Sequence, residues 1–187
     1  MFIVFDGLDG SGKSTQAELL CSHLDEFNNS YVLRTHPSDD NYFGRNSREY
    51  LLKQGKVAHV FASLFYLLDV IRSILFYHGK PVDYVIFVRY LMGTAYLPES
   101  LYMIGYRFFR WFVPKSQYMF FIDTSPAEAH QRIESNRQEK EMFESLEKLE
   151  KIHKKLTRIA ARPEWIVLDG DQPEEHIFEE VKLALSL

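Results

Sequence analysis

The chain has 187 residues, of which 46% are hydrophobic and 26% are charged, and its formal net charge is -4. These values are typical of a single globular domain, here residues 1–187, that is large enough for a substantial core. The negative charge argues against a nucleic acid polymer as partner, because proteins that bind one need a basic surface.

The chain is expected to start with a buried strand, Phe2-Ile3-Val4-Phe5, which is short, apolar and rich in β-forming residues. No signal peptide is expected before this strand, which fits a cytoplasmic protein. The apolar residues that follow recur at helical spacing between Ala17 and Phe27, so a helix is expected there.

A phosphate-binding loop is predicted between this strand and this helix. The letters G-L-D-G-S-G-K-S fit the pattern G-x-x-x-x-G-K-[ST]. Glycines let backbone N–H groups converge on phosphate oxygens, Lys13 reaches the terminal phosphates, and Ser14 offers a hydroxyl to Mg²⁺. A chance glycine-rich turn is the alternative, but the strand and the helix on either side favour ATP and Mg²⁺. The predicted cofactor-binding residues of the loop are Gly7, Leu8, Asp9, Gly10, Ser11, Gly12, Lys13, Ser14 and Thr15.

Four further apolar runs are expected to be strands, at residues 31–35, 84–88, 117–122 and 165–168. They alternate with helical segments, which predicts an α/β fold: a five-stranded parallel sheet with helices on both faces. Arg89 directly follows the third of the five strands. An arginine at the carboxyl end of a buried parallel strand is expected to face the ligand crevice. Arg45 and Arg48, on a predicted helix, are compatible either with a phosphate contact or with surface charge.

The segment from Val57 to Tyr77 is the most apolar of the chain. Its length is compatible with a membrane span, but Asp69 and Arg72 interrupt it and would be costly in lipid. We therefore expect a central core helix rather than contact with a membrane. The aromatic-rich segment from Leu91 to Val113 is compatible with either core packing or a subunit interface.

A polar segment follows the fourth strand and its helix, from Glu134 to Glu141. It is compatible with a solvated helix face or with a short lid, at about residues 134–143, that brings Arg137 over bound phosphates. A long amphipathic helix is expected next, with apolar positions from Met142 to Ile159.

In order along the chain, these motifs resemble those of the thymidylate kinase family of nucleoside monophosphate kinases, which have the P-loop NTPase fold. The resemblance covers nearly the whole chain. It rests on F-I-V-F-D-G-L-D-G-S-G-K-S-T-Q at the start, T-H-P-S for the family's R-E-P, Y-L-L-D-V for F-A-A-D-R, V-R-Y for D-R-Y, R-I-E-S-N-R-Q-E-K-E-M-F-E for the lid, and W-I-V-L-D-G-D near the end.

The resemblance implies a function: transfer of the γ-phosphoryl group of ATP to a nucleotide 5′-phosphate, with dTMP as the favoured acceptor. It also implies a homodimer and no membrane partner. Lys13, Arg89 and Arg137 would be catalytic, and Arg132 would join the loop in holding ATP. Asp9, Tyr66, Arg89 and Tyr96 would bind the acceptor, and Ser14 would bind the metal.

The chain departs from the family pattern at Val88, where the family has the aspartate of D-R-Y, and at Val70, where it has a base-recognising arginine. Asp6, Asp69 and Asp123 are the candidates to replace the missing carboxylate. These departures keep two alternatives open: a nucleotide-binding paralogue with little or no kinase activity, and a kinase for another small acceptor.

Overall fold

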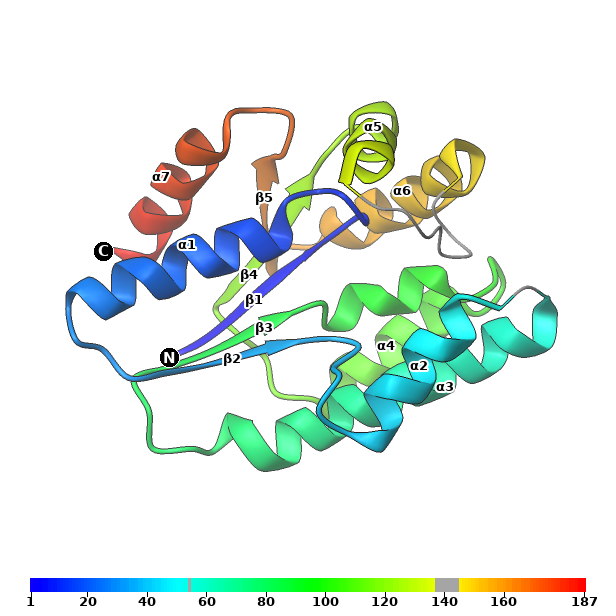
Figure 1. Ribbon diagram of the computed structural model, residues 1–187, viewed down its shortest axis with the longest axis horizontal. Coiled ribbons are helices and arrows are strands. Elements are labelled where there is room, and N and C mark those ends of the chain that lie inside the picture. The colour runs from blue at the N-terminus through cyan, green and yellow to red at the C-terminus, as the bar shows by residue number, and fades with distance from the viewer. Residues whose placement is uncertain (54, 137–144) are drawn as a thin grey trace.

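The structure is a computed structural model that describes residues 1–53, 55–136 and 145–187. A parallel sheet runs through its centre (Figure 1). The described strands are β1 (Phe2–Gly7), β2 (Tyr31–Thr35), β3 (Tyr84–Val88), β4 (Tyr118–Asp123) and β5 (Trp165–Asp169). Their order is β2-β3-β1-β4-β5 and every neighbouring pair is parallel, which confirms the predicted five-stranded sheet.

The order of the strands places the candidate site. Because β1 is central and both of its neighbours run parallel to it, the loops after β1, β3 and β4 leave the same edge of the sheet. The phosphate loop leaves β1 at this edge, and Arg89 follows β3 one strand away.

Helices cover both faces of the sheet, as predicted (Figure 1). Helices α1 (Lys13–Glu26) and α7 (Glu174–Leu185) pack on one face through Leu20, Leu24 and Val181. The other face is covered by α4 (Tyr102–Phe112), α6 (Leu146–Ala160) and the 3₁₀ helix η2 (Leu91–Tyr96). The remaining described helices are α2 (Tyr42–Leu51), α3 (Lys56–Ser73), a π-helical turn η1 (Ile74–His78) and α5 (Pro126–Asn136).

The long apolar helix is not the central core helix that the sequence predicts. Within the described residues, the segment Val57–His78 is long and apolar enough to cross a membrane, yet only 22% of its apolar window is buried. Val57 and Leu75 are 69% and 77% exposed, whereas Val70 is buried. One side of α3 packs against α2 and η2, and the other presents apolar side chains at the surface. The prediction was wrong because apolar composition does not reveal what covers a helix face.

The aromatic segment before β4 is divided between the core and the surface. Tyr102 and Tyr106 of α4 are buried, whereas Phe108, Trp111 and Phe112 are exposed. Helix α6 begins at Leu146, and Met142, which was expected to belong to it, lies outside the described residues.

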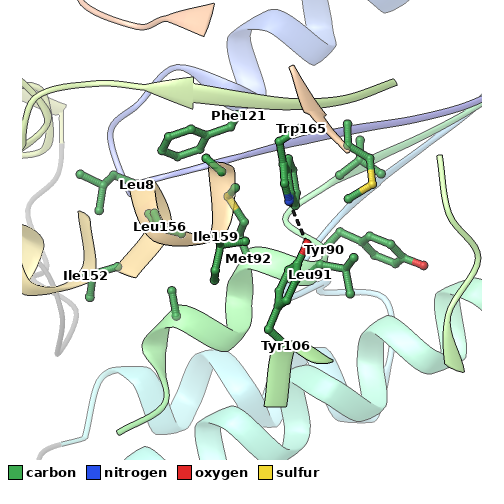
Figure 2. Packing of buried hydrophobic residues seen from close by; sticks show 14 of the residues in the cluster. Leu8, Tyr90, Leu91, Met92, Tyr106, Phe121, Ile152, Leu156, Ile159 and Trp165 are labelled. Atoms are coloured by element: carbon green, nitrogen blue, oxygen red, sulfur yellow. Dashed lines mark hydrogen bonds between the residues drawn. The ribbon is translucent and has the colours of Figure 1, made fainter. Parts of the chain in front are cut away.

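A buried hydrogen bond joins α4 to β5 in the core (Figure 2). The Nε1 atom of Trp165 donates to the hydroxyl of Tyr106 at 2.9 Å, and this hydroxyl donates to Glu164 at 3.0 Å. Tyr106 is fully buried, so its hydroxyl is the partner that makes burial of the indole N–H tolerable.

Tyr106→Phe is therefore expected to lower the free energy of unfolding by about 1–3 kcal/mol, because the Trp165 N–H loses its partner. Denaturant unfolding measures the difference. The matched control is Tyr42→Phe, at a ring that is 62% exposed. Equal effects of the two substitutions would contradict the assignment.

Candidate active site

The phosphate loop has the backbone that a phosphate cradle requires. Gly10 and Gly12 have φ values of 79° and 85°, in the left-handed region that favours glycine. Helix α1 begins at Lys13, and among the described residues no side chain caps this end. The buried hydroxyl of Ser11 likewise has no hydrogen-bond partner among them. An uncapped helix N-terminus beside an unpartnered donor fits a bound phosphate group.

Gly10 is also fixed by its surroundings. A Cβ atom there would lie 2.5 Å from the backbone oxygen of Ala129 in α5. Gly10→Ala is therefore expected to destabilise the fold by about 1–3 kcal/mol and to weaken ATP binding at least tenfold, because the loop must move. Unfolding and nucleotide titrations measure both effects. Gly79→Ala is the control, since no described atom lies within 4 Å of a Cβ there; similar losses in both variants would contradict this account.

Lys13, Asp9 and Arg89 form a charged cluster at the mouth of the site. The Lys13 ammonium donates to the backbone oxygen of Leu8 at 2.5 Å and lies 3.8 Å from the Asp9 carboxylate. Arg89 forms an ion pair with Asp9 through the same carboxylate oxygen, Oδ1. Tyr96 donates its hydroxyl to Asp9 Oδ2 at 3.1 Å. Asp9 thus links the phosphate loop to Arg89, which follows β3, and to Tyr96 of η2. It also holds the positive charges of Lys13 and Arg89 close to each other.

The loop after β2 holds Arg89 in place. Arg89 has a φ of 63°, which a non-glycine residue rarely adopts, and its backbone N–H donates to Phe5. Its guanidinium donates to the backbone oxygen of His36 at 3.3 Å, and His36 Nδ1 bonds to the backbone oxygen of Arg89 at 2.9 Å. Burial lowers the pKa of His36 to about 4, so the ring is neutral at pH 7. Nδ1 is the donor because its partner is a carbonyl oxygen.

Asp6, on β1, supports the backbone that directly follows Arg89. One carboxylate oxygen accepts from the backbone N–H groups of Tyr90 and Met92 at 2.9 and 3.1 Å. Complete burial raises the pKa of this carboxyl to about 6, and the two N–H donors offset part of that rise. Asp6 therefore positions the backbone of Tyr90 and Met92, directly after Arg89.

The raised pKa makes stability depend on pH. The folded protein holds the Asp6 proton more tightly than the unfolded chain, whose carboxyl has a pKa of 3.8, so ionisation of Asp6 costs stability as pH rises. Asp6→Asn keeps an oxygen for both N–H groups and removes this dependence. Its free energy of unfolding, relative to the wild type, is expected to rise by about 2 kcal/mol between about pH 4.5 and pH 7.5. Denaturant unfolding at both values measures this, with Asp39→Asn as control; parallel pH dependences of Asp6→Asn and the wild type would contradict it.

The other predicted site residues lie around this cluster, except where the structure does not describe them. Ser14 and Thr15 lie in the first turn of α1, and Ser14 is exposed. Arg132 on α5 bonds to Glu128 at 2.8 Å, and its Nη1 lies 4.0 Å from where a Cβ of Gly12 would be. Arg137 and most of the predicted lid, residues 137–143, lie outside the described residues.

Val88 places a buried apolar side chain at the position where the family pattern has a carboxylate. Its side chain is fully buried in the core beneath α1. Asp69 accepts from Ser38 and Asn41, and Asp123 pairs with His153 at 2.6 Å, so both have structural partners. Among the described residues no three His, Cys, Asp or Glu side chains gather to hold a metal.

A cavity of about 350 Å³ opens beside Asp9 and Arg89 and extends between α3, η2 and α4. Tyr66 and Tyr96 line it, as their predicted acceptor roles require. The Tyr66 ring packs directly on Gly93, where a Cβ atom would lie 2.4 Å from the ring, and its hydroxyl donates to the backbone oxygen of Tyr90 at 3.0 Å.

Sequence reasoning missed three residues that shape this site: Asp6 as the support of the turn, His36 as the partner of Arg89, and Gly93 as the space for Tyr66. A glycine between the strand end and Tyr96 was the available signal for the last. The contacts of Asp6 and His36 join segments that are distant in the sequence, so no local sequence pattern indicates them.

Comparison with known proteins agrees with this geometry. A family model of thymidylate kinase matches residues 5–181. The chain belongs to the thymidylate kinase family. The thymidylate kinases of Leptospira borgpetersenii serovar Hardjo-bovis and Thermosipho africanus are 29% and 27% identical to it, over 96% and 97% of this chain and 90% and 96% of theirs. The solved thymidylate kinase of Candida albicans matches the fold with a TM-score of 0.70 at 20% identity, over 99% of this chain and 90% of that one.

Membership of the thymidylate kinase family confirms the predicted P-loop fold and the class of enzyme, an ATP-dependent phosphotransferase acting on nucleotides rather than on nucleic acid polymers. It does not favour the non-catalytic paralogue that Val88 and Val70 kept open. Thymidylate kinases in general use ATP and Mg²⁺, which the loop and Ser14 fit.

Proposed function

We propose that the protein transfers the γ-phosphoryl group of ATP to the 5′-phosphate of dTMP, giving ADP and dTDP. The observation that carries this proposal is the Asp9–Arg89 pair. Asp9 belongs to the loop that fits ATP phosphates, and both side chains line the cavity that fits an acceptor. Donor and acceptor would thus meet at one charged cluster.

Each side chain of the cluster has a distinct task in this proposal. Lys13 and the N-terminus of α1 hold the terminal phosphates of ATP, and Arg89 neutralises charge on the acceptor phosphate and the moving phosphoryl group. An oxygen of the acceptor phosphate forms the new bond to the γ-phosphorus, and the bond to the bridging oxygen of ADP breaks. Mg²⁺, held at Ser14, supplies further charge neutralisation when bound.

The remaining assignments concern the acceptor and the edge of the site. Asp9 and Tyr96 would contact the sugar, and Tyr66 would lie against the base. Arg132 would contact ATP, and Arg137 would reach the phosphates from a lid at residues 134–143. The whole chain, residues 1–187, would act as one kinase domain.

A panel of acceptors tests the proposal. Purified protein with ATP and Mg²⁺ is assayed for ADP with dTMP, with other nucleoside monophosphates and with no acceptor. We expect ADP to form with dTMP well above the acceptor-free rate. Tight ATP binding with no ADP for any acceptor would contradict the proposal and return the chain to the class of non-catalytic nucleotide-binding proteins.

We also propose that the protein is a homodimer that works in the cytoplasm without a membrane partner. The apolar faces of α3 and α4 are exposed, and Trp111 is 80% exposed, so a second copy has a large apolar surface to cover. Arg72, whose side chain is partly exposed on α3, argues against lipid contact. Sedimentation equilibrium is expected to give twice the mass of the chain; a monomer at micromolar concentration would contradict this.

A further inference from the structure

The cavity beside Asp9 and Arg89 is charged only at one end. Among the described residues that line the cavity, Asp9 is the acidic side chain and Arg89 is the basic one besides His59. Most of the other lining side chains are apolar, including Leu64, Leu67, Val70 and Leu97. A ligand that fits would place an anionic group at Arg89 and a weakly polar body among these side chains.

Most hydroxyl groups that line the cavity already donate their proton within the protein. Tyr66 donates to Tyr90 at 3.0 Å, Tyr96 to Asp9 at 3.1 Å, Thr94 to Leu91 at 2.8 Å and Ser47 to Ala62 at 3.0 Å. Among the described lining residues, Ser63 is the hydroxyl not committed in this way. Two other donor side chains line the cavity: Arg89, which pairs with Asp9, and His59, whose Nε2 lies 2.5 Å from the backbone oxygen of Tyr96. The carbonyl oxygens of a base would therefore find few uncommitted side-chain donors beyond Ser63 here.

Val70 lies one helical turn beyond Tyr66 on α3 and lines the same cavity, where it is 4% exposed. It offers no hydrogen bond. Tyr66 is fixed by its bond to Tyr90 and by its packing on Gly93, so it contributes a ring surface rather than a free hydroxyl. These two residues thus provide stacking and apolar contact, which recognise shape.

We propose that this pocket selects the acceptor base by shape and apolar contact, and that the hydrogen-bonding edge of the base contributes little to selection. The inference rests on the proposed function, a kinase for nucleoside 5′-monophosphates, and names the acceptor class: 5′-monophosphates with a flat, weakly polar base. A pocket that hydrogen-bonds its substrate rejects an analogue lacking those groups by about 10⁴–10⁵-fold, whereas an apolar pocket discriminates by about 10–200-fold for one methylene.

A shape analogue of thymine tests this directly. The deoxyriboside 5′-monophosphate of 2,4-difluorotoluene has nearly the outline of dTMP and lacks its hydrogen-bonding groups. We expect kcat/KM for this analogue to lie within about fivefold of that for dTMP, and dUMP, which lacks only the methyl group, to fall by about 10-fold or more. A loss of over 100-fold for the analogue, with dTMP phosphorylated normally, would overturn the inference.

The same assay separates this failure from failure of the proposed function. If dTMP itself gives no ADP above the acceptor-free rate, the kinase proposal fails and the inference falls with it. If dTMP is phosphorylated, the ratio of dTMP to the analogue decides the inference alone.

Three variants locate the effect. Val70→Thr places a hydroxyl in the cavity at nearly constant volume and is expected to raise the preference for dTMP over the analogue at least threefold, while Val70→Ile, the apolar control, keeps the ratio. Ser63→Ala tests the remaining hydroxyl. A tenfold loss confined to dTMP in Ser63→Ala would show that Ser63 reads the base edge and would overturn the inference.

Discussion

Lys13→Met is expected to lower kcat by about 10²–10³-fold, because it removes a positive charge from the place where charge develops during phosphoryl transfer. Methionine keeps much of the length of the side chain, and Lys13 is only 4% exposed, so the main loss is the ammonium group. Steady-state kinetics with saturating ATP and dTMP measure the change.

Two results separate this loss from misfolding. The Asp9 carboxylate keeps Arg89 and Tyr96 as partners in the variant, so the unfolding free energy should change far less than the rate. Lys115→Met, at an exposed lysine before β4, is the matched control and should keep the wild-type kcat. A kcat for Lys13→Met within threefold of the wild type would contradict the assigned role.

Arg89→Ala is expected to lower kcat/KM for the acceptor by about 10²–10³-fold and to destabilise the protein as well. The destabilisation arises because Asp9, which is 3% exposed, loses its ion-pair partner and remains charged. Breaking a buried pair in this way costs about 3–5 kcal/mol, and the nearby Lys13 places the value at the lower end. Kinetics and denaturant unfolding measure the two effects separately.

A second substitution divides the two effects of losing Arg89. Asp9→Asn combined with Arg89→Ala removes the unpaired charge, so it should recover much of the stability and none of the activity. Arg107→Ala, at an exposed arginine of α4, is the control for loss of an arginine alone. Recovery of activity along with stability would show that Arg89 acts only through the fold.

The sequence predicts the framework of this protein because the framework depends on local patterns. Short apolar runs such as Phe2–Phe5 and residues 84–88 are typical of buried strands, and their alternation with helical segments predicts a parallel sheet. The glycine pattern from Gly7 to Ser14 predicts the phosphate loop because few other backbones need those residues at that spacing.

Contacts between distant segments were not predictable in the same way. His36 and Asp6 meet the turn around Arg89 only after β1, β2 and β3 have paired. The surface position of α3 also depends on tertiary packing, since its composition alone is that of a core helix. The sequence shows that the carboxylate is missing at Val88, but not that the three candidates to replace it, Asp6, Asp69 and Asp123, bond to other partners in the fold.

The most direct test of the whole account uses ATP radiolabelled in its γ-phosphate, dTMP and Mg²⁺, with the products separated and counted. We expect the label to appear in the β-phosphate of dTDP, in an amount equal to the ADP formed, and we expect Lys13→Met to abolish most of it. Label that remains in ATP, or that appears only as inorganic phosphate, would contradict the assignment of this protein as a kinase for dTMP.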